Sequence, residues 1–283
     1  MKKYLSIAWT FALACMLLTA SIGCAESDSI PTYEVLPHSF NDANYIMEHG
    51  MGGVELEMVP AEDGSVQGYN DGYSLELNSQ IGFFYYKRPN TYPHLFGNVS
   101  EMERAWLTDE DKMQLSDEPG LYTPEEAAEA GLQFLRDVMG MDTSCLYARE
   151  ILAGEADKER SCVYQIQYSY RVPDMRVGWW WTTQRGLNIQ LWITDSGVDE
   201  AYGCAVSFAP YGEVAQANIL AQDAIADLAQ SSTPPELMYL PIEQDGKAVL
   251  SPIWAANLDD SSPRGYDALT GEKLLSGWDL VDP

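Results

Sequence analysis

The three histidines, His38, His49 and His94, are the first candidates for catalysis or metal binding, and all lie in the N-terminal third of the chain. Zinc sites usually pair His or Cys ligands about two to five residues apart, and no such pair occurs here. The motifs Gly-x-Ser-x-Gly and His-Glu-x-x-His, which mark common hydrolases and metalloproteases, are also missing. We therefore expect no catalytic residue, no metal site and no cofactor.

Carboxylates are numerous, with 43 Asp and Glu residues in all. Any fold with so many acids brings pairs together by chance, so a hydrolase with a carboxylate pair is the least favoured alternative. The visible clusters are Asp109-Glu110-Asp111 and Asp259-Asp260. Neither has the alternating ligands and central glycine of an EF-hand loop. We interpret both clusters as solvated surface charge.

Trp179, Trp180 and Trp181 form the most unusual feature of the sequence. They lie in a link between two expected strands, and neighbouring side chains of an extended segment point to opposite faces. At least one indole must then face away from any single core. If exposed, the three rings would form a binding site for an extracellular carbohydrate or peptide. A strand covered on both sides is the favoured alternative, because large aromatic residues are usually buried.

Four cysteines follow the first 23 residues: Cys24, Cys145, Cys162 and Cys204. Without Cys24 the count is odd, so at most one internal disulfide can form. Cys162 and Cys204 lie on the apolar faces of expected strands, and they are the pair that we predict. The alternative is three buried thiols that act as small apolar side chains.

Residues 1–23 have the form of a signal peptide. Two lysines follow Met1, an apolar run extends to about residue 20, and the first acid is Glu26. A spanning helix would need about 20 predominantly apolar residues. The segment Ser21-Ile22-Gly23-Cys24 resembles a bacterial lipobox, in which the cysteine thiol accepts diacylglycerol. We expect a protein anchored through Cys24 to the outer face of the cell membrane. Ordinary cleavage, which would release a protein that starts at Glu26, is the alternative.

The charge of the chain limits its partners. Without Lys2 and Lys3, 14 of the 16 Lys and Arg residues remain against 43 acids, a net charge of −29 after signal removal. Nucleic acids and anionic lipid surfaces carry the same sign and are excluded. Cations and basic peptides stay possible as partners. The hydrophobic content of 46% indicates a packed globular protein rather than a disordered stalk.

The hydrophobic patterns predict an α+β protein. The segment Thr123-Pro124-Glu125-Glu126 is a capping box that begins an amphipathic helix, and four strands with alternating patterns follow it. A second, shorter unit repeats this order, with a helix over residues 221–230 and hairpins after it. We divide the chain into the signal peptide, a tether and β-rich region over 24–118, a helix with four strands over 119–212, and a helix with hairpins over 213–283. A helix packed on an antiparallel sheet, repeated once, is the expected fold.

This arrangement resembles the PepSY-like and YcdB/YpeB-type extracellular bacterial proteins over residues 121–283. The resemblance rests on Thr123-Pro124-Glu125-Glu126-Ala127, Tyr168-Ser169-Tyr170-Arg171 with Gly178, Asp195-Ser196-Gly197-Val198, Pro252-Ile253-Trp254, and Tyr266-Asp267-Ala268-Leu269-Thr270-Gly271-Glu272. It implies a cystatin-like fold and a non-enzymatic role, in which the protein inhibits, chaperones or regulates another envelope protein. The runner-up hypothesis is a carbohydrate- or peptide-binding module that uses the tryptophan segment. The oligomeric state stays open.

Overall fold

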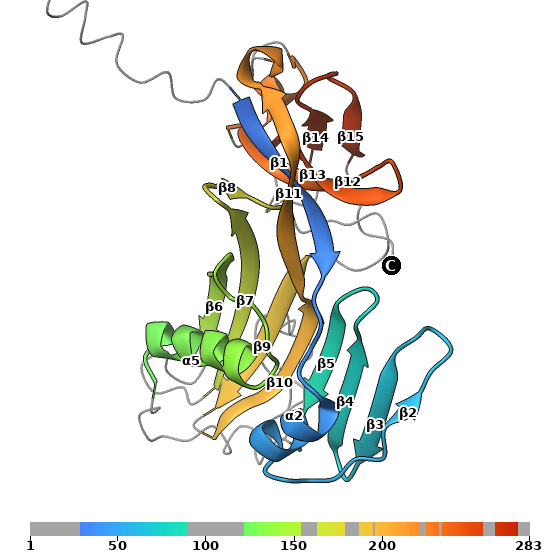
Figure 1. Ribbon diagram of the computed structural model, residues 1–283. Coiled ribbons are helices and arrows are strands. Elements are labelled where there is room, and N and C mark those ends of the chain that lie inside the picture. The colour runs from blue at the N-terminus through green and yellow to red at the C-terminus, as the bar shows by residue number, and fades with distance from the viewer. Residues whose placement is uncertain are drawn as a thin grey trace, which may run out of the picture.

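Two antiparallel sheets form the protein, as the computed structural model in Figure 1 shows. The structure describes residues 29–89, 122–153, 163–178, 187–194, 196–220, 225–231, 234–256 and 264–276. Among these, strands account for 53% of the residues and helices for 15%. The two α-helices of this part are α2 (Ala43–Gly50) and α5 (Pro124–Asp137). Neither is long and apolar enough to cross a membrane.

The larger sheet has nine strands. Its order along one path is β2 (Val59–Pro60), β3 (Val66–Asn70), β4 (Tyr73–Asn78), β5 (Phe83–Lys87), β10 (Gly197–Cys204), β9 (Asn188–Thr194), β7 (Val163–Val172) and β6 (Leu146–Ala153), and β8 (Met175–Arg176) pairs with β7.

The smaller sheet has six strands. Its path is β11 (Val206–Ala215), β1 (Ser29–Pro37), β13 (Lys247–Ala256), β14 (Arg264–Asp267) and β15 (Lys273–Ser276), and β12 (Glu236–Gln244) pairs with β13. Its first strand thus pairs with strands that lie about 170 to 220 residues later in the chain.

The prediction of an α+β fold with a repeated helix-on-sheet unit is wrong, because the protein is β-rich. Strands that the sequence reading assigned to separate regions pair into common sheets: β5 with β10, and β1 with β11 and β13. The second predicted helix, over residues 221–230, is a single 3-10 turn at Leu228–Gln230 in its described part. There Ile225 and Leu228 pack on Ala256 and Tyr266, and these tertiary contacts override a weak helical pattern.

Helix α5 forms where the capping box predicts it. The Thr123 side chain accepts a hydrogen bond from the Glu126 backbone N–H, and the Glu126 carboxylate accepts one from the Thr123 N–H. Both bonds satisfy donors that a helix N-terminus leaves unpaired. Its buried residues, Ala127, Ala128, Gly131 and Leu135, face the larger sheet. Figure 1 shows α5 across β7, β9 and β10 and α2 beside β4.

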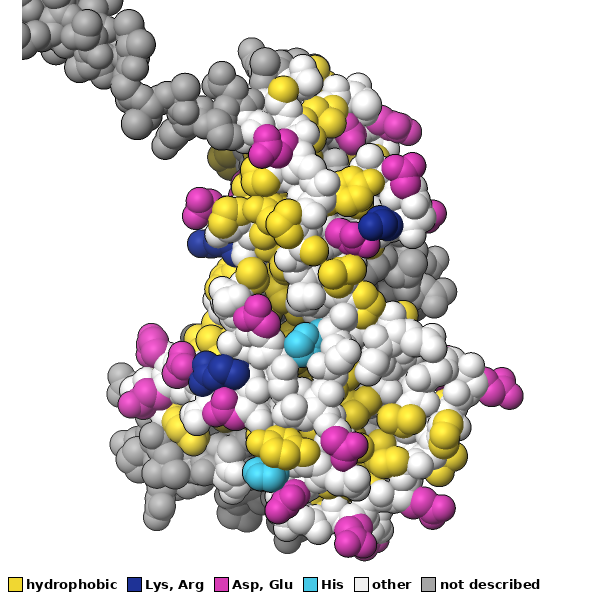
Figure 2. Space-filling model, viewed as in Figure 1, with side chains coloured by type: hydrophobic (Ala, Val, Ile, Leu, Met, Phe, Trp, Pro, Cys, Tyr) yellow, Lys and Arg dark blue, Asp and Glu magenta, His cyan; other side chains and the backbone are white. Residues whose placement is uncertain are grey.

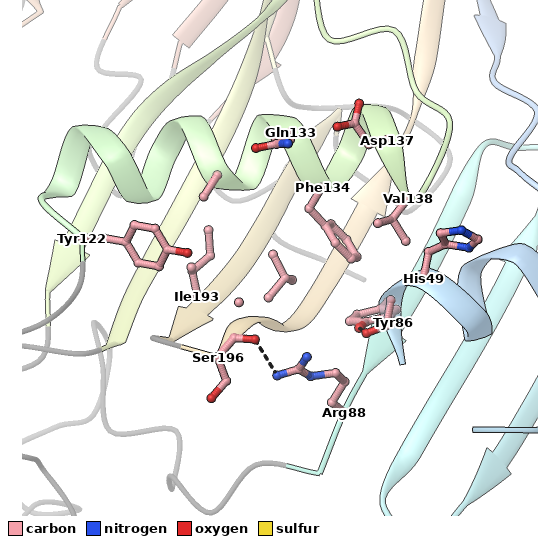
Figure 3. Close-up of a pocket in the computed structure, with 14 residues that line it drawn as sticks. His49, Tyr86, Arg88, Tyr122, Gln133, Phe134, Asp137, Val138, Ile193 and Ser196 are labelled. Carbon is pink, nitrogen blue, oxygen red and sulfur yellow. Dashed lines mark hydrogen bonds between the residues drawn. The ribbon is translucent and has the colours of Figure 1, made fainter. Parts of the chain in front are cut away.

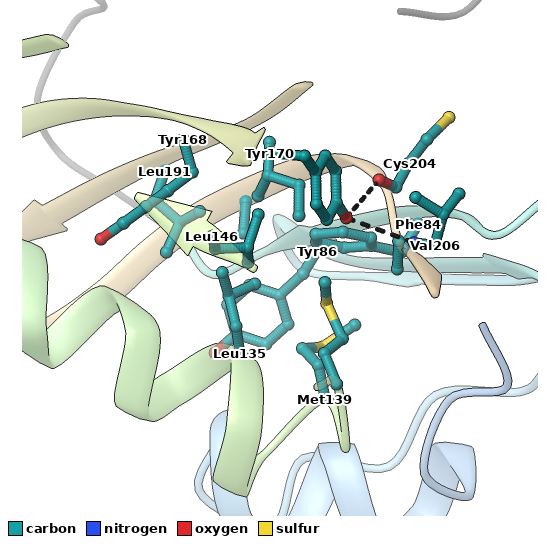
Figure 4. Packing of buried hydrophobic residues seen from close by; sticks show 14 of the residues in the cluster. Phe84, Tyr86, Leu135, Met139, Leu146, Tyr168, Tyr170, Leu191, Cys204 and Val206 are labelled. Carbon is teal, nitrogen blue, oxygen red and sulfur yellow. Dashed lines mark hydrogen bonds between the residues drawn. The ribbon is translucent and has the colours of Figure 1, made fainter. Parts of the chain in front are cut away.

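The main core lies between these helices and the larger sheet. Tyr86, Phe84, Leu135 and Met139 are fully buried within it, as Figure 4 shows. Tyr170, also fully buried, donates its hydroxyl to the Cys204 carbonyl (3.0 Å) and accepts the Val206 N–H (3.2 Å). This phenol therefore stabilises the chain where β10 leaves the larger sheet and β11 enters the smaller one.

Candidate functional site

A cleft opens between α5 and the larger sheet, with a volume of about 300 Å³. It is bounded by α5, the end of α2, the end of β5 and the turn from β9 to β10, as Figure 3 shows. The α5 segment contributes Tyr122, Ala130, Gln133, Phe134, Asp137 and Val138 to its described lining, and α2 contributes His49 and Gly50. The larger sheet contributes Tyr86 of β5, Arg88 just after β5, Ile193 of β9, Ser196 of the turn, and Gly197 and Val198 of β10. A volume near 300 Å³ is at the lower end for ligand pockets.

The floor of the cleft is apolar and firmly held. Phe134 packs edge-on against Tyr86, with ring centroids 4.9 Å apart. The Tyr86 hydroxyl donates to the Gly50 carbonyl at 2.5 Å, and burial raises the pKa of this phenol far above its usual value. Ile193 and Val138 complete the floor. These side chains offer a fixed apolar surface to an incoming group.

Arg88 is the cation of the rim. Its Nη2 donates to the Asp199 carboxylate at 2.7 Å and to the Ser196 carbonyl at 3.1 Å. The Arg88 side chain is 25% exposed and the Asp199 side chain 7%. A nearly buried carboxylate thus neutralises the positive charge of the rim, and removing either partner would leave a poorly solvated charge.

Asp137, in the last turn of α5, is the carboxylate of the rim. It pairs with Arg136 at 3.1 Å, but both side chains are about half exposed, so this pair contributes little and leaves the carboxylate available. Across the cleft, the His49 ring stacks on Tyr45 with centroids 4.0 Å apart, and its Nδ1 lies 3.0 Å from the Tyr45 carbonyl.

The hydrogen bonds found for Ser196 and His49 go to Arg88, Thr194 and Tyr45, so none joins a nucleophile to a base. Within the described ranges, no group of three His, Cys, Asp or Glu side chains could hold a metal ion.

Most of the residues singled out from the sequence are outside the described part of the chain. Cys24, Cys162 and Trp179–Trp181 fall outside the described residues, as do His94 and both acidic clusters. At the near end of the tryptophan segment, the Gly178 N–H donates to the Tyr239 carbonyl at 2.7 Å, which joins the two sheets. Cys204 is buried at the end of β10, and its disulfide with Cys162 stays a prediction.

Sequence reasoning missed the cleft, although one signal was visible. Lys87-Arg88 is a pair of adjacent cations in a chain with few of them, and it marks the position where Arg88 meets Asp199. Of the three histidines, His49 lies in the cleft. His38 instead contacts the Gly140 carbonyl through Nε2 at 2.8 Å and has a structural position.

Comparison with known proteins assigns no family. No family model matches the chain, and no curated protein matches it. Among solved structures, it is similar to an uncharacterized protein from Eubacterium rectale at 11% sequence identity, with a TM-score of 0.44 and coverage of 87% of this chain and 86% of the other.

Proposed function

We propose that this chain is an exported, lipid-anchored, non-catalytic protein that binds another extracellular protein, and that a basic segment of that partner occupies the cleft beneath α5. The observation that carries the proposal is the composition of the cleft. It has an apolar floor, an arginine already neutralised by Asp199 and a half-exposed carboxylate at Asp137. Such a site accepts an apolar side chain next to a positive charge.

The charge of the whole molecule supports a basic partner. Figure 2 shows Asp and Glu side chains spread over both sheets, with few Lys or Arg among them. The formal net charge is −27. A field of this sign draws cationic segments toward the surface and raises their association rate.

Peptide binding tests this function directly. The probe is a panel of fluorescent decapeptides in which Leu or Phe is flanked by lysines, beside a matched panel with glutamates. We expect the basic panel to bind, with an affinity that falls as salt is added. Asp137→Lys should weaken binding about five- to tenfold, roughly 1–1.4 kcal/mol, because the rim loses its carboxylate and gains a like charge.

Glu129→Lys is the matched control. Glu129 is exposed on the same helix but is not part of the cleft lining, so the same change in net charge should alter the affinity less than about twofold. Equal losses in the two variants would show that only the overall charge matters. Tighter binding of the glutamate panel would overturn the proposed partner.

A further inference from the structure

The face of the larger sheet opposite α5 and α2 carries a straight row of polar and aromatic side chains. The strand register aligns one residue from each of seven adjacent strands. We call these residues the polar row: Gln67, Glu76, Tyr85, Tyr202, Gln190, Gln167 and Glu150. The row crosses six strand spacings of roughly 4.8 Å each, about 29 Å in total.

Alternation along the strands explains the chemistry of this face. The neighbours of the row, such as Phe84, Leu191 and Tyr168, are fully buried against the helices. The residues that alternate with these along each strand, which include the polar row, point to the other side of the sheet. On that side, six members of the polar row are partly buried and Glu150 is exposed.

The row is a set of hydrogen-bonding groups interleaved with rings. The Tyr202 hydroxyl donates to Gln190 Oε1, and the Tyr85 hydroxyl donates to Glu200 Oε1 at 3.2 Å. Trp192 lies beside Tyr202 with ring centroids 5.6 Å apart. Burial, and then the Glu200 carboxylate, raise the pKa of Tyr85 to about 12, so this phenol stays a donor at neutral pH.

Two acceptors at one end of this face lack a partner among the described residues. Gln165 Oε1 and Ser169 Oγ are buried without a hydrogen bond, and their residues are 9% and 3% exposed. Both belong to β7 and lie on the same face as Gln167. Buried polar atoms normally have hydrogen-bond partners, and a buried polar atom without one destabilises the fold.

We propose that this face binds an extended, uncharged, hydroxyl-rich polysaccharide that lies along the polar row. Sugar hydroxyls donate to the amide and carboxylate oxygens, while the apolar faces of sugar rings pack on Tyr85, Tyr202 and Trp192. Glu76 and Glu150 of the row repel polyanions, whereas Lys87 Nζ lies 3.6 Å from Glu200 and offsets the charge of that carboxylate. A protein partner is less favoured, because interface cores are depleted in charged residues.

This proposal is independent of the proposed function, because the cleft lies on the other side of the sheet. Affinity electrophoresis of the full mature chain tests it, in gels that contain laminarin, xylan or glucomannan, with polygalacturonate as the polyanion. We expect at least one neutral glycan to retard the protein and polygalacturonate to have no effect. The double variant Tyr85→Ala/Tyr202→Ala should lose at least about tenfold in affinity, because two of the rings that pack on the sugar are removed.

Two further variants separate binding from folding. Tyr69→Ala removes a ring that is 60% exposed at the edge of this face and should weaken retardation without altering the unfolding midpoint. Tyr45→Ala removes a ring that is 41% exposed beside the cleft, and it should leave retardation unchanged. The proposal is overturned if no neutral glycan retards the protein or if polygalacturonate does. The proposal is also overturned if the double variant is still retarded by the glycan. It is overturned as well if the double variant by itself abolishes peptide binding.

Discussion

Gly131 determines how closely α5 approaches the larger sheet. A Cβ at this position would lie 2.2 Å from the Tyr168 hydroxyl and 3.1 Å from Ile193 Cδ1. Tyr168 cannot retreat easily, since it is fully buried and donates to the Ala128 carbonyl at 2.7 Å. The lack of a side chain at Gly131 therefore lets the helix rest on a tyrosine that is itself bonded to the helix.

Two opposing effects decide what Gly131→Ala does. Alanine favours a helix over glycine by about 0.5–1 kcal/mol, whereas overpacking a tight core costs about 1–3 kcal/mol. Because a bonded hydroxyl occupies the space, we expect overpacking to win and the free energy of unfolding to fall by about 1–2 kcal/mol. Urea unfolding measures it. Gly212→Ala, where the Cβ would meet only Thr32 Oγ1 at 3.4 Å, should be nearly neutral. A Gly131→Ala protein as stable as the parent would contradict this packing.

The residues of the cleft show what a sequence alone cannot predict. Arg88 and Asp199 are 111 positions apart, and they meet only because β5 pairs with β10. The alternation of Gln165, Gln167 and Ser169 on one face was predictable from the pattern of β7. Their alignment with Tyr85 and Tyr202 was not, because it depends on the register between distant strands.

At the scale of elements, short sequence motifs predicted the helix and the hairpin that contacts between neighbouring residues stabilise. The helix that begins after Thr123 was predicted from its capping box. Hairpins were predicted after residue 230, and β12 and β13 form one, at whose turn Asp245 and Gly246 have positive φ angles of 54° and 75°. Helix α2 was missed. It has eight residues and a single side-chain cap, from Asp42 to the Asn44 N–H, so its stability comes from burial of Ile46 and Met47.

Asp227 joins the 3-10 turn Leu228–Gln230 to the last two strands. Its carboxylate accepts the Tyr266 hydroxyl and lies 3.2 Å from Arg264 Nη1 and 3.7 Å from Lys273 Nζ. The Tyr266 hydrogen bond and the two cations lower the pKa of Asp227 below its ordinary value of 3.8. These contacts replace the helical hydrogen bonds that the sequence pattern led us to expect.

The stability of this corner should depend on pH. Because the pKa of Asp227 is lower in the folded state, its stabilisation is present above pH 3.8 and is lost as the pH falls through the folded pKa. Hydrogen exchange at about pH 6 and about pH 3, corrected for intrinsic rates, should show protection of residues 225–231 and 264–276 falling more than that of β3–β5. Asp227→Asn should have low protection in this corner at both pH values. Unchanged protection in the variant would show that the carboxylate is dispensable.

At the scale of the whole molecule, two segments connect the sheets. The chain passes from β10 to β11 at Ala205, whose N–H donates to the Gly82 carbonyl and whose carbonyl accepts the His38 N–H. The other connection runs from β1, in the smaller sheet, to α2 on the larger one. Figure 1 shows β1 beginning at the end of the smaller sheet that lies farthest from α5. The start of β1 at Ser29 and the cleft are therefore at opposite ends of the described structure.

This geometry orients the protein if Cys24 carries the proposed lipid. Only residues 25–28 separate Cys24 from Ser29, where β1 begins, and five residue steps reach at most about 18 Å. The smaller sheet would lie close to the membrane, while the cleft and the polar row would face outward to extracellular partners.

Cys24→Ser tests the anchor on which this orientation depends. Each buried CH₂ of an acyl chain contributes about 0.8 kcal/mol to membrane binding, and the serine variant cannot accept the lipid through a thioether. We expect the parent protein in the membrane fraction, with an intact mass that shows an acylated N-terminal cysteine. The variant should leave that fraction, whereas Cys145→Ser, at a partly buried thiol in the loop before β6, should remain there. A parent protein that starts at Glu26 without lipid would make it a secreted protein, and the two binding surfaces would then act free of the membrane.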